Sequence, residues 1–140
     1  MRFFAGSDIV FGSGSIQQLP ELLKPWNGQK VMIVSDPGVT AAGIAGRVQR
    51  ILEEGGLQTR LFSEVQANPT NENVNRAAQL ARDYAPDLFV AVGGGSSIDL
   101  AKAVSLLMTN PDPIEAYGGI GNVPKKGLPL AAVPTTSGTS

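Results

Sequence analysis

Leu88-Phe89-Val90-Ala91-Val92, followed at once by Gly93-Gly94-Gly95-Ser96, is the stretch that decides the fold. Its first five residues are all apolar, as in a parallel strand that is covered on both faces. The segment 97–109 after the glycines is apolar nearly all round, which predicts a largely buried helix. A strand, a glycine turn and a helix are therefore expected in direct succession.

The same alternation of strands and helices extends through the rest of the chain. Short apolar runs predict further strands at residues 31–34 and 130–133, and residues 59–62 are another strand candidate. Apolar residues at helical spacing predict helices at 39–54 and 71–84. This succession predicts an α/β fold with a Rossmann-like, doubly wound parallel sheet. Phe3-Phe4 and Ile9-Val10-Phe11 flank a Gly-Ser-Asp turn, which predicts an N-terminal β-hairpin.

Composition excludes several classes of protein. Of the 140 residues, 42% are hydrophobic and 16% are charged, which is typical of a globular domain. A net charge of −1 without basic clusters argues against a nucleic acid or a membrane surface as a partner. The sequence has no cysteine, no apolar run of the roughly 20 residues that span a bilayer and no apolar signal segment, so we expect a cytoplasmic protein.

The sequence also lacks histidine. Histidine is the commonest general base and the commonest ligand of catalytic metals. We therefore assign no catalytic residue and no metal ligand to this chain.

The glycine turn is the strongest candidate for chemistry. A helix N-terminus presents unpaired N–H groups and a partial positive charge, and glycines let a bulky anion approach the backbone. The alternative is a tight turn in which Ser96 or Ser97 is an ordinary helix cap. One glycine would usually suffice for such a turn, so three in a row favour phosphate binding.

Acidic residues stand at two further candidate positions. Asp36 ends the strand 31–34, where a carboxylate can accept the hydroxyls of an adenosine ribose, and it also precedes Pro37 as a helix N-cap would. Both roles can hold together. Asp99 suits the first turn of the glycine-turn helix, and its spacing to Lys102 permits an ion pair. Asp99 would repel a phosphate, so we expect any contact with the cofactor to be through the ribose or the nicotinamide side.

The chain closes on Pro134-Thr135-Thr136-Ser137-Gly138-Thr139-Ser140. Its hydroxyls can line a nucleotide or cap a helix, and composition favours neither reading. A polar loop after a buried strand is an unusual end for a chain, so we interpret the sequence as a fragment.

Together these motifs resemble those of the iron-containing, metal-dependent (group III) alcohol dehydrogenase family. Residues 93–102 match Gly-Gly-Gly-Ser-x-x-Asp-x-x-Lys, and residues 134–139 match Pro-Thr-Thr-x-Gly-Thr. Phe11-Gly12-x-Gly14, Asp36 and the Asn68-Pro69-Thr70 loop resemble the family in the same order, so the resemblance covers the whole chain. Glycerol dehydrogenases and dehydroquinate synthases share the architecture, but their glycine loops usually continue differently.

The resemblance implies a two-domain enzyme. An N-terminal domain binds NAD(P), and a helical C-terminal domain holds Fe²⁺ or Zn²⁺, which acts as a Lewis acid while hydride passes between an alcohol or aldehyde and the nicotinamide. Residues 1–140 would be the NAD(P)-binding domain, truncated before the metal-binding helical domain, and inactive alone. NAD is favoured over NADP, since Asp36 would repel a 2′-phosphate. The cofactor-binding residues implied are Asp36 at the adenosine ribose, Asn68 near the cofactor, Gly94, Gly95 and Ser96 at the pyrophosphate, and Asp99, Thr135, Thr136 and Thr139 at further contacts.

Two alternatives stay open. One is a stand-alone nucleotide-binding or interaction module without catalysis, and the other is an enzyme of the glycerol dehydrogenase or dehydroquinate synthase type. A small-molecule alcohol or aldehyde is the partner expected for the leading hypothesis. The N-terminal hairpin offers a sheet edge for pairing, from which we also predict a homodimer.

Overall fold

The computed structural model describes residues 2–3, 9–11, 16–110, 125 and 127–135. The elements in chain order are β1 (Arg2–Phe3), β2 (Ile9–Phe11), the 3-10 helix η1 (Ile16–Gln18), α1 (Leu19–Leu23), the 3-10 helix η2 (Lys24–Trp26), β3 (Lys30–Ser35), α2 (Pro37–Ala41), α3 (Ile44–Glu54), β4 (Gln58–Phe62), α4 (Asn71–Tyr84), β5 (Leu88–Gly93), α5 (Gly95–Thr109) and β6 (Leu130–Pro134).

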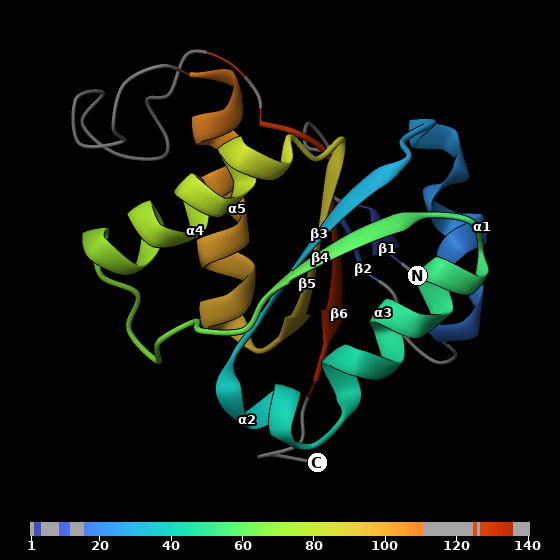
Figure 1. Ribbon diagram of the computed structural model, residues 1–140, viewed down its shortest axis with the longest axis horizontal. Helices are drawn as coiled ribbons and strands as arrows, with labels where there is room; N and C mark the ends of the chain where they lie inside the picture. The colour runs from blue at the N-terminus through green and yellow to red at the C-terminus, as the bar shows by residue number, and fades with distance from the viewer. Residues whose placement is uncertain (1, 4–8, 12–15, 111–124, 126, 136–140) are drawn as a thin grey trace.

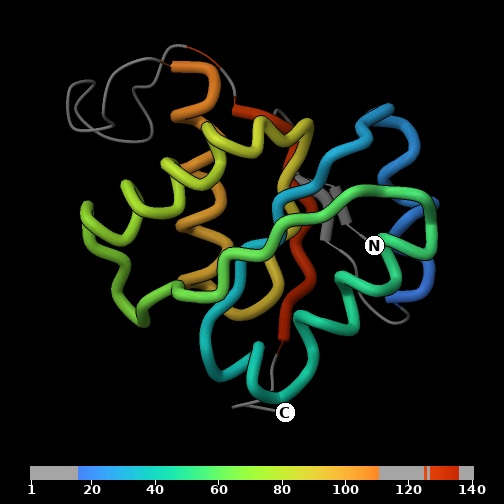
Figure 2. The backbone as a smooth tube through the Cα atoms, viewed as in Figure 1, coloured from blue at the N-terminus to red at the C-terminus, as the bar shows by residue number. Residues whose placement is uncertain are grey.

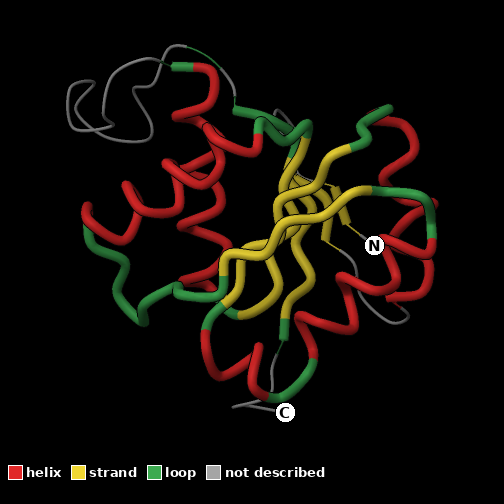
Figure 3. The backbone as a smooth tube through the Cα atoms, in the orientation of Figure 1, coloured by secondary structure: helices red, strands yellow, loops and turns green. Residues whose placement is uncertain are grey.

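The described strands form one sheet in the order β1-β2-β6-β5-β3-β4. Strand β1 pairs antiparallel with β2, and every other neighbouring pair is parallel. The sheet lies between two groups of helices, as Figure 3 shows. The predicted doubly wound parallel sheet and the predicted N-terminal hairpin are therefore both confirmed.

The two faces of the sheet carry separate cores. On one face, Met32 and Phe89 pack with α4 and α5, and on the other, Ile33 and Val90 pack with α1 and α3 (Figure 1). Strand β5 is buried along its whole length, as its unbroken apolar sequence predicts. Full burial of each such aliphatic side chain stabilises the fold by roughly 1.5–3 kcal/mol relative to exposure.

The helix predicted over residues 39–54 is wrong as a single element. The chain forms α2 and α3 instead, separated at Gly43, which adopts the left-handed region with φ 86°. The Gly43 amide bonds to the Thr40 carbonyl and closes the first helix. Glycine tolerates this conformation at no steric cost, so it can redirect the chain within a run whose apolar spacing continues.

Helix α5 begins two residues before its predicted start. Gly94 is the N-cap and Gly95 already has helical geometry, so two of the three glycines belong to the helix end rather than to a separate loop. Among the helices that the structure describes, none combines the length and the apolar character that a membrane span requires.

Candidate functional site

Three sequence-predicted site segments meet where the parallel strands end. Asp36 follows β3, Gly93 ends β5, and Thr135 follows β6. The carboxyl ends of these strands lie at the lower edge of the sheet in Figure 1. The Thr135 amide donates to the Gly93 carbonyl at 3.0 Å. In open α/β sheets this carboxyl edge is where ligands bind.

Asp36 caps α2 and also faces the glycine turn. Its Oδ1 accepts a hydrogen bond from the Val39 amide at 2.7 Å, so the predicted N-cap role is confirmed. The second oxygen, Oδ2, would lie 3.5 Å from a Cβ placed on Gly93. The half-buried carboxylate therefore has one oxygen fixed by the helix and the other directed toward the turn.

The glycine turn combines one crowded position with two open ones. Gly93 has φ 150°, and a Cβ there would lie 2.7 Å from Ser97 Oγ, so the turn requires glycine. Gly94 and Gly95 are exposed, and a Cβ on either would meet nothing within 4 Å. The space in front of them is open to an approaching group.

No side chain caps the first turn of α5. The interpretation of Ser96 or Ser97 as an ordinary cap is therefore wrong, because Gly94 occupies the N-cap position and has no side chain to donate or accept. The start of α5 therefore lies beside the open space at Gly94 and Gly95. Uncapped amides at such a position bind anions well.

The two serines of the turn have different surroundings. The Ser96 hydroxyl donates to the Ala67 carbonyl and so joins the turn to the loop before α4. Ser97 is 1% exposed, and its Oγ has no hydrogen-bond partner among the residues that the structure describes. An unpaired buried hydroxyl is costly, and among the described residues Ser97 shares this state with Thr40 and Tyr84.

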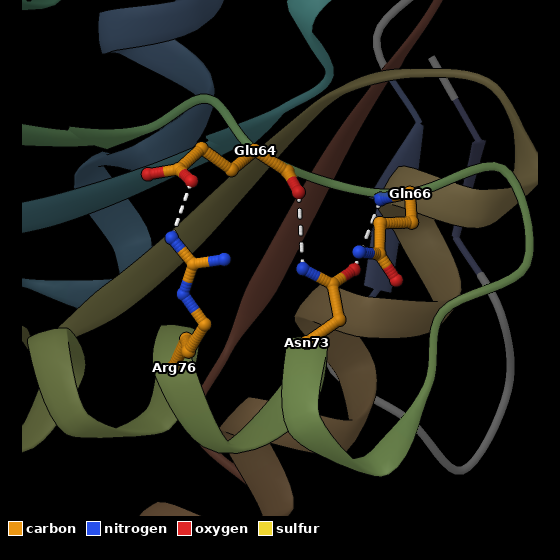
Figure 4. Close-up of polar contacts among 4 residues, drawn as sticks. All are labelled: Glu64, Gln66, Asn73 and Arg76. Carbon is orange, nitrogen blue, oxygen red and sulfur yellow. Dashed lines mark hydrogen bonds and ion pairs between the residues drawn. The ribbon is translucent and has the colours of Figure 1, made fainter.

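Asn68 lies in the loop that Ser96 contacts, and it is exposed. Asn73 of α4 hydrogen-bonds to the backbone of Glu64 and Gln66 in this loop, and Arg76 of α4 pairs with the exposed Glu64 side chain, as Figure 4 shows. Sequence reasoning missed Asn73. Its signal was its spacing, since it lies four residues before the buried Ala77 and eight before Ala81.

The remaining predicted residues are less well defined by the structure. Asp99 and Lys102 are both exposed, and the described residues form ion pairs only between Lys24 and Glu21 and between Arg76 and Glu64, so the predicted Asp99–Lys102 pair is wrong. An exposed pair at this spacing gains only about 0.2–0.5 kcal/mol and costs side-chain entropy. Thr135 is half-buried, and Thr136 and Thr139 lie outside the described residues.

No group of three potential metal ligands occurs among the described residues. A cavity of about 200 Å³ lies between Pro20, Gly28 and Gly55. It adjoins the starts of β3 and β4, at the opposite edge of the sheet from the glycine turn. We place the candidate site at the turn rather than in this cavity, because the uncapped helix end and the Asp36 carboxylate converge there.

Several known proteins are similar to this chain in both sequence and fold. Alcohol dehydrogenase 4 of Saccharomyces cerevisiae is 39% identical over 130 residues, covering 93% of this chain and 34% of that protein. The NADPH-dependent butanol dehydrogenase of Clostridium saccharobutylicum is 36% identical over 145 residues, covering 100% of this chain and 36% of its own length. The chain thus spans about a third of the curated relatives it matches.

Solved structures agree with these relatives. A 1,3-propanediol oxidoreductase superposes with a TM-score of 0.83 at 30% identity, covering 94% of this chain and 34% of that one. The sulfoacetaldehyde reductase of Bifidobacterium kashiwanohense, solved in complex with NAD⁺, superposes with a TM-score of 0.78 at 27% identity, covering 95% of this chain and 35% of that one. The family model for iron-containing alcohol dehydrogenases matches residues 6–140. With that match over nearly the whole sequence, the chain belongs to the iron-containing alcohol dehydrogenase family.

Proposed function

We propose that this chain is the dinucleotide-binding part of an oxidoreductase that transfers a hydride between an alcohol or aldehyde and NAD(P). The observation that carries the proposal is the uncapped start of α5 behind two open glycines, with the Asp36 carboxylate facing the same turn. A helix end of this kind suits a pyrophosphate, and a carboxylate at the end of a neighbouring strand suits a ribose.

The residues present fit such a cofactor. Gly94 and Gly95 leave room for a phosphate, and the first-turn amides of α5 supply donors for it. The unpaired Ser97 hydroxyl adds a polar atom beside the same turn. Further cofactor contacts are proposed for the backbone of Ser96 and for Asn68, Asp99, Thr135, Thr136 and Thr139.

NAD is the cofactor that we propose in preference to NADP. Oδ1 of Asp36 caps α2, which leaves Oδ2 available to accept a hydrogen bond from a ligand. An ionised carboxylate accepts ribose hydroxyls but repels a 2′-phosphate. One relative is described as NADPH-dependent and another was solved with NAD⁺, so membership of the family leaves this choice to the site itself.

We further propose that the 140-residue chain does not oxidise alcohols by itself. Its sequence has no histidine, and the described residues gather no three metal ligands, so the residues present do not fit the family's metal centre and we assign none of them to it. The Fe²⁺ or Zn²⁺ of the complete enzyme would supply Lewis-acid chemistry from the part of the relatives that this chain does not cover.

Calorimetric titration with NADH and NADPH tests the proposal. We expect NADH to bind more tightly, and Asp36→Ala to remove that preference. Asp36→Asn is the matched control, because asparagine keeps the helix cap but lacks the charge. If Asn retains the preference for NADH, charge repulsion is not its cause. If the wild-type chain melts cooperatively yet binds neither dinucleotide, the proposed function is wrong for this chain.

A further inference from the structure

Residues 64–68, which lead from β4 toward α4, have no regular secondary structure. We call them the 64–68 segment. They lie at the carboxyl edge of the sheet, next to the glycine turn, as the green trace in Figure 2 shows. Within the segment, the Val65 amide donates to the Ser35 carbonyl of β3 at 3.2 Å, and the Val65 side chain is buried. Three further backbone groups of the segment are hydrogen-bonded to side chains.

Asn73 of α4 holds two of these groups at once. Its Oδ1 accepts from the Gln66 amide at 2.9 Å, and its Nδ2 donates to the Glu64 carbonyl at 3.0 Å (Figure 4). The residue is 1% exposed. A side-chain amide carries a donor and an acceptor on one short stem, so asparagine satisfies both groups, whereas an ionised carboxylate can only accept and would satisfy one.

Ser96 of α5 holds a third group, the Ala67 carbonyl. A serine hydroxyl has one proton, so while it donates to Ala67 it has none to donate to a phosphate. Its backbone N–H lies in the first turn of α5, which no side chain caps. The side chain and the backbone of Ser96 therefore serve different groups.

Side chains from two separate helices thus form hydrogen bonds to neighbouring backbone groups of one irregular segment. Ordering a free loop costs roughly 1–2 kcal/mol per residue, and a ligand that must order a loop binds more weakly for that reason. A segment fixed in advance removes that cost. Asn68, a proposed cofactor contact, directly follows Ala67, whose carbonyl is held.

We propose that Asn73 and Ser96 together form a clip that fixes the 64–68 segment as a wall of the dinucleotide site. Both are positioning residues in this role, and the Ser96 hydroxyl acts through Ala67 rather than on the cofactor. This inference rests on the proposed dinucleotide function. It predicts that the two side chains, which lie on different helices, depend on one another.

A double-mutant cycle tests the clip in the 140-residue chain, using NADH affinity from calorimetry and amide hydrogen exchange at Gln66 from NMR. The variants are Asn73→Ala, Ser96→Ala and the double variant, with Ser96→Thr to restore the hydroxyl. Each alanine variant should weaken NADH binding about tenfold, which corresponds to about 1.4 kcal/mol. The double variant should be little weaker than either one, because losing either end already frees the segment.

Hydrogen exchange supplies the readout that is independent of the cofactor. Asn73→Ala removes the acceptor of the Gln66 amide and must speed its exchange. Ser96→Ala should also speed it, although Ser96 makes no bond to Gln66, and Ser96→Thr should restore protection and affinity. Arg76→Gln is the matched control, because it breaks the exposed ion pair to Glu64 in the same segment but leaves the backbone held. Its affinity should stay within about twofold of the wild type.

The outcomes separate this inference from the function it rests on. Wild-type affinity in both alanine variants, or fully additive losses with unchanged Gln66 exchange in Ser96→Ala, would overturn the clip while leaving the proposed function intact. Absence of NADH and NADPH binding by the folded wild-type chain would overturn both.

Discussion

Replacing Gly93 by alanine should destabilise the fold strongly, although it adds only one methyl group. The backbone there has φ 150°, which an alanine adopts at a cost of roughly 1–3 kcal/mol. The new Cβ would lie 2.7 Å from Ser97 Oγ and 3.2 Å from Ser97 Cβ, and such overpacking adds roughly 1–3 kcal/mol. We therefore expect a loss of about 2–6 kcal/mol in the free energy of unfolding.

Thermal unfolding followed by circular dichroism measures this effect. For 140 residues, the entropy of unfolding is about 0.3 kcal/mol/K, so the midpoint should fall by about 7–20 °C. The double variant Gly93→Ala, Ser97→Ala should recover part of the loss, because it removes Oγ but keeps Cβ. Ser97→Ala alone should be neutral or slightly stabilising, since the hydroxyl has no partner among the described residues.

Gly95→Ala is the matched control. A Cβ there meets nothing within 4 Å, and alanine in a helix is more stable than glycine by roughly 0.5–1 kcal/mol, so the melting temperature should not fall. Its methyl group would, however, occupy the space proposed for a phosphate and weaken NADH binding. A Gly93→Ala chain that melts within about 3 °C of the wild type would refute the steric reasoning.

Three further predictions concern other parts of the molecule. The amides of Gln29 and Lys30 hold the pKa of Asp87 below its usual range, so this carboxylate stabilises the fold above its unfolded pKa of about 3.9, and the stabilisation is lost as the pH falls through the folded pKa. Urea titrations should accordingly show Asp87→Asn less stable than the wild type by roughly 1 kcal/mol at pH 7, with the difference shrinking below pH 4; an equal difference at both pH values contradicts it. The Tyr84 ring lies under Lys30 and Arg60, while its buried hydroxyl lacks a partner among the described residues and burial raises the pKa of that hydroxyl. Tyr84→Phe should therefore keep or slightly raise the melting temperature. A clear fall in the melting temperature would show that the hydroxyl is hydrogen-bonded. The edge strand β1 should pair two chains into a homodimer, which equilibrium sedimentation checks, a purely monomeric distribution ruling it out for this chain.

The central strands β3, β5 and β6 could be predicted because each is a short, buried apolar run bounded by turn residues. The break at Gly43 could not, because Ile44, Val48 and Ile51 keep the same helical spacing that a continuous helix would show. Periodicity reports which face is buried, and it is silent on a change in the direction of the helix axis.

The candidate site, too, could be predicted from the sequence only in part. Asp36 and the glycine turn could be placed at one edge, since parallel strands all end there. The Ser96 contact could not be predicted, because Ala67 lies 29 residues earlier and its carbonyl is a backbone group that every residue carries. In the sequence, Asn73 stands out only as a polar residue on the buried face of the helix 71–84. Its hydrogen-bond partners are determined by the path of the 64–68 segment in space.

The position of β6 has a consequence for how the molecule assembles. Among the strands that the structure describes, the N-terminal hairpin joins the rest of the sheet only through β6, with Ile9 opposite Leu130. About 120 further residues must therefore be synthesised after β2 before it can pair with its parallel partner, and closing so long a loop is entropically slow. Until then, β5 lacks one of its neighbours and the hairpin has nowhere to dock. We expect the helices and strands between them to collapse first, and the insertion of β6 to be the late event that unites the two ends of the chain.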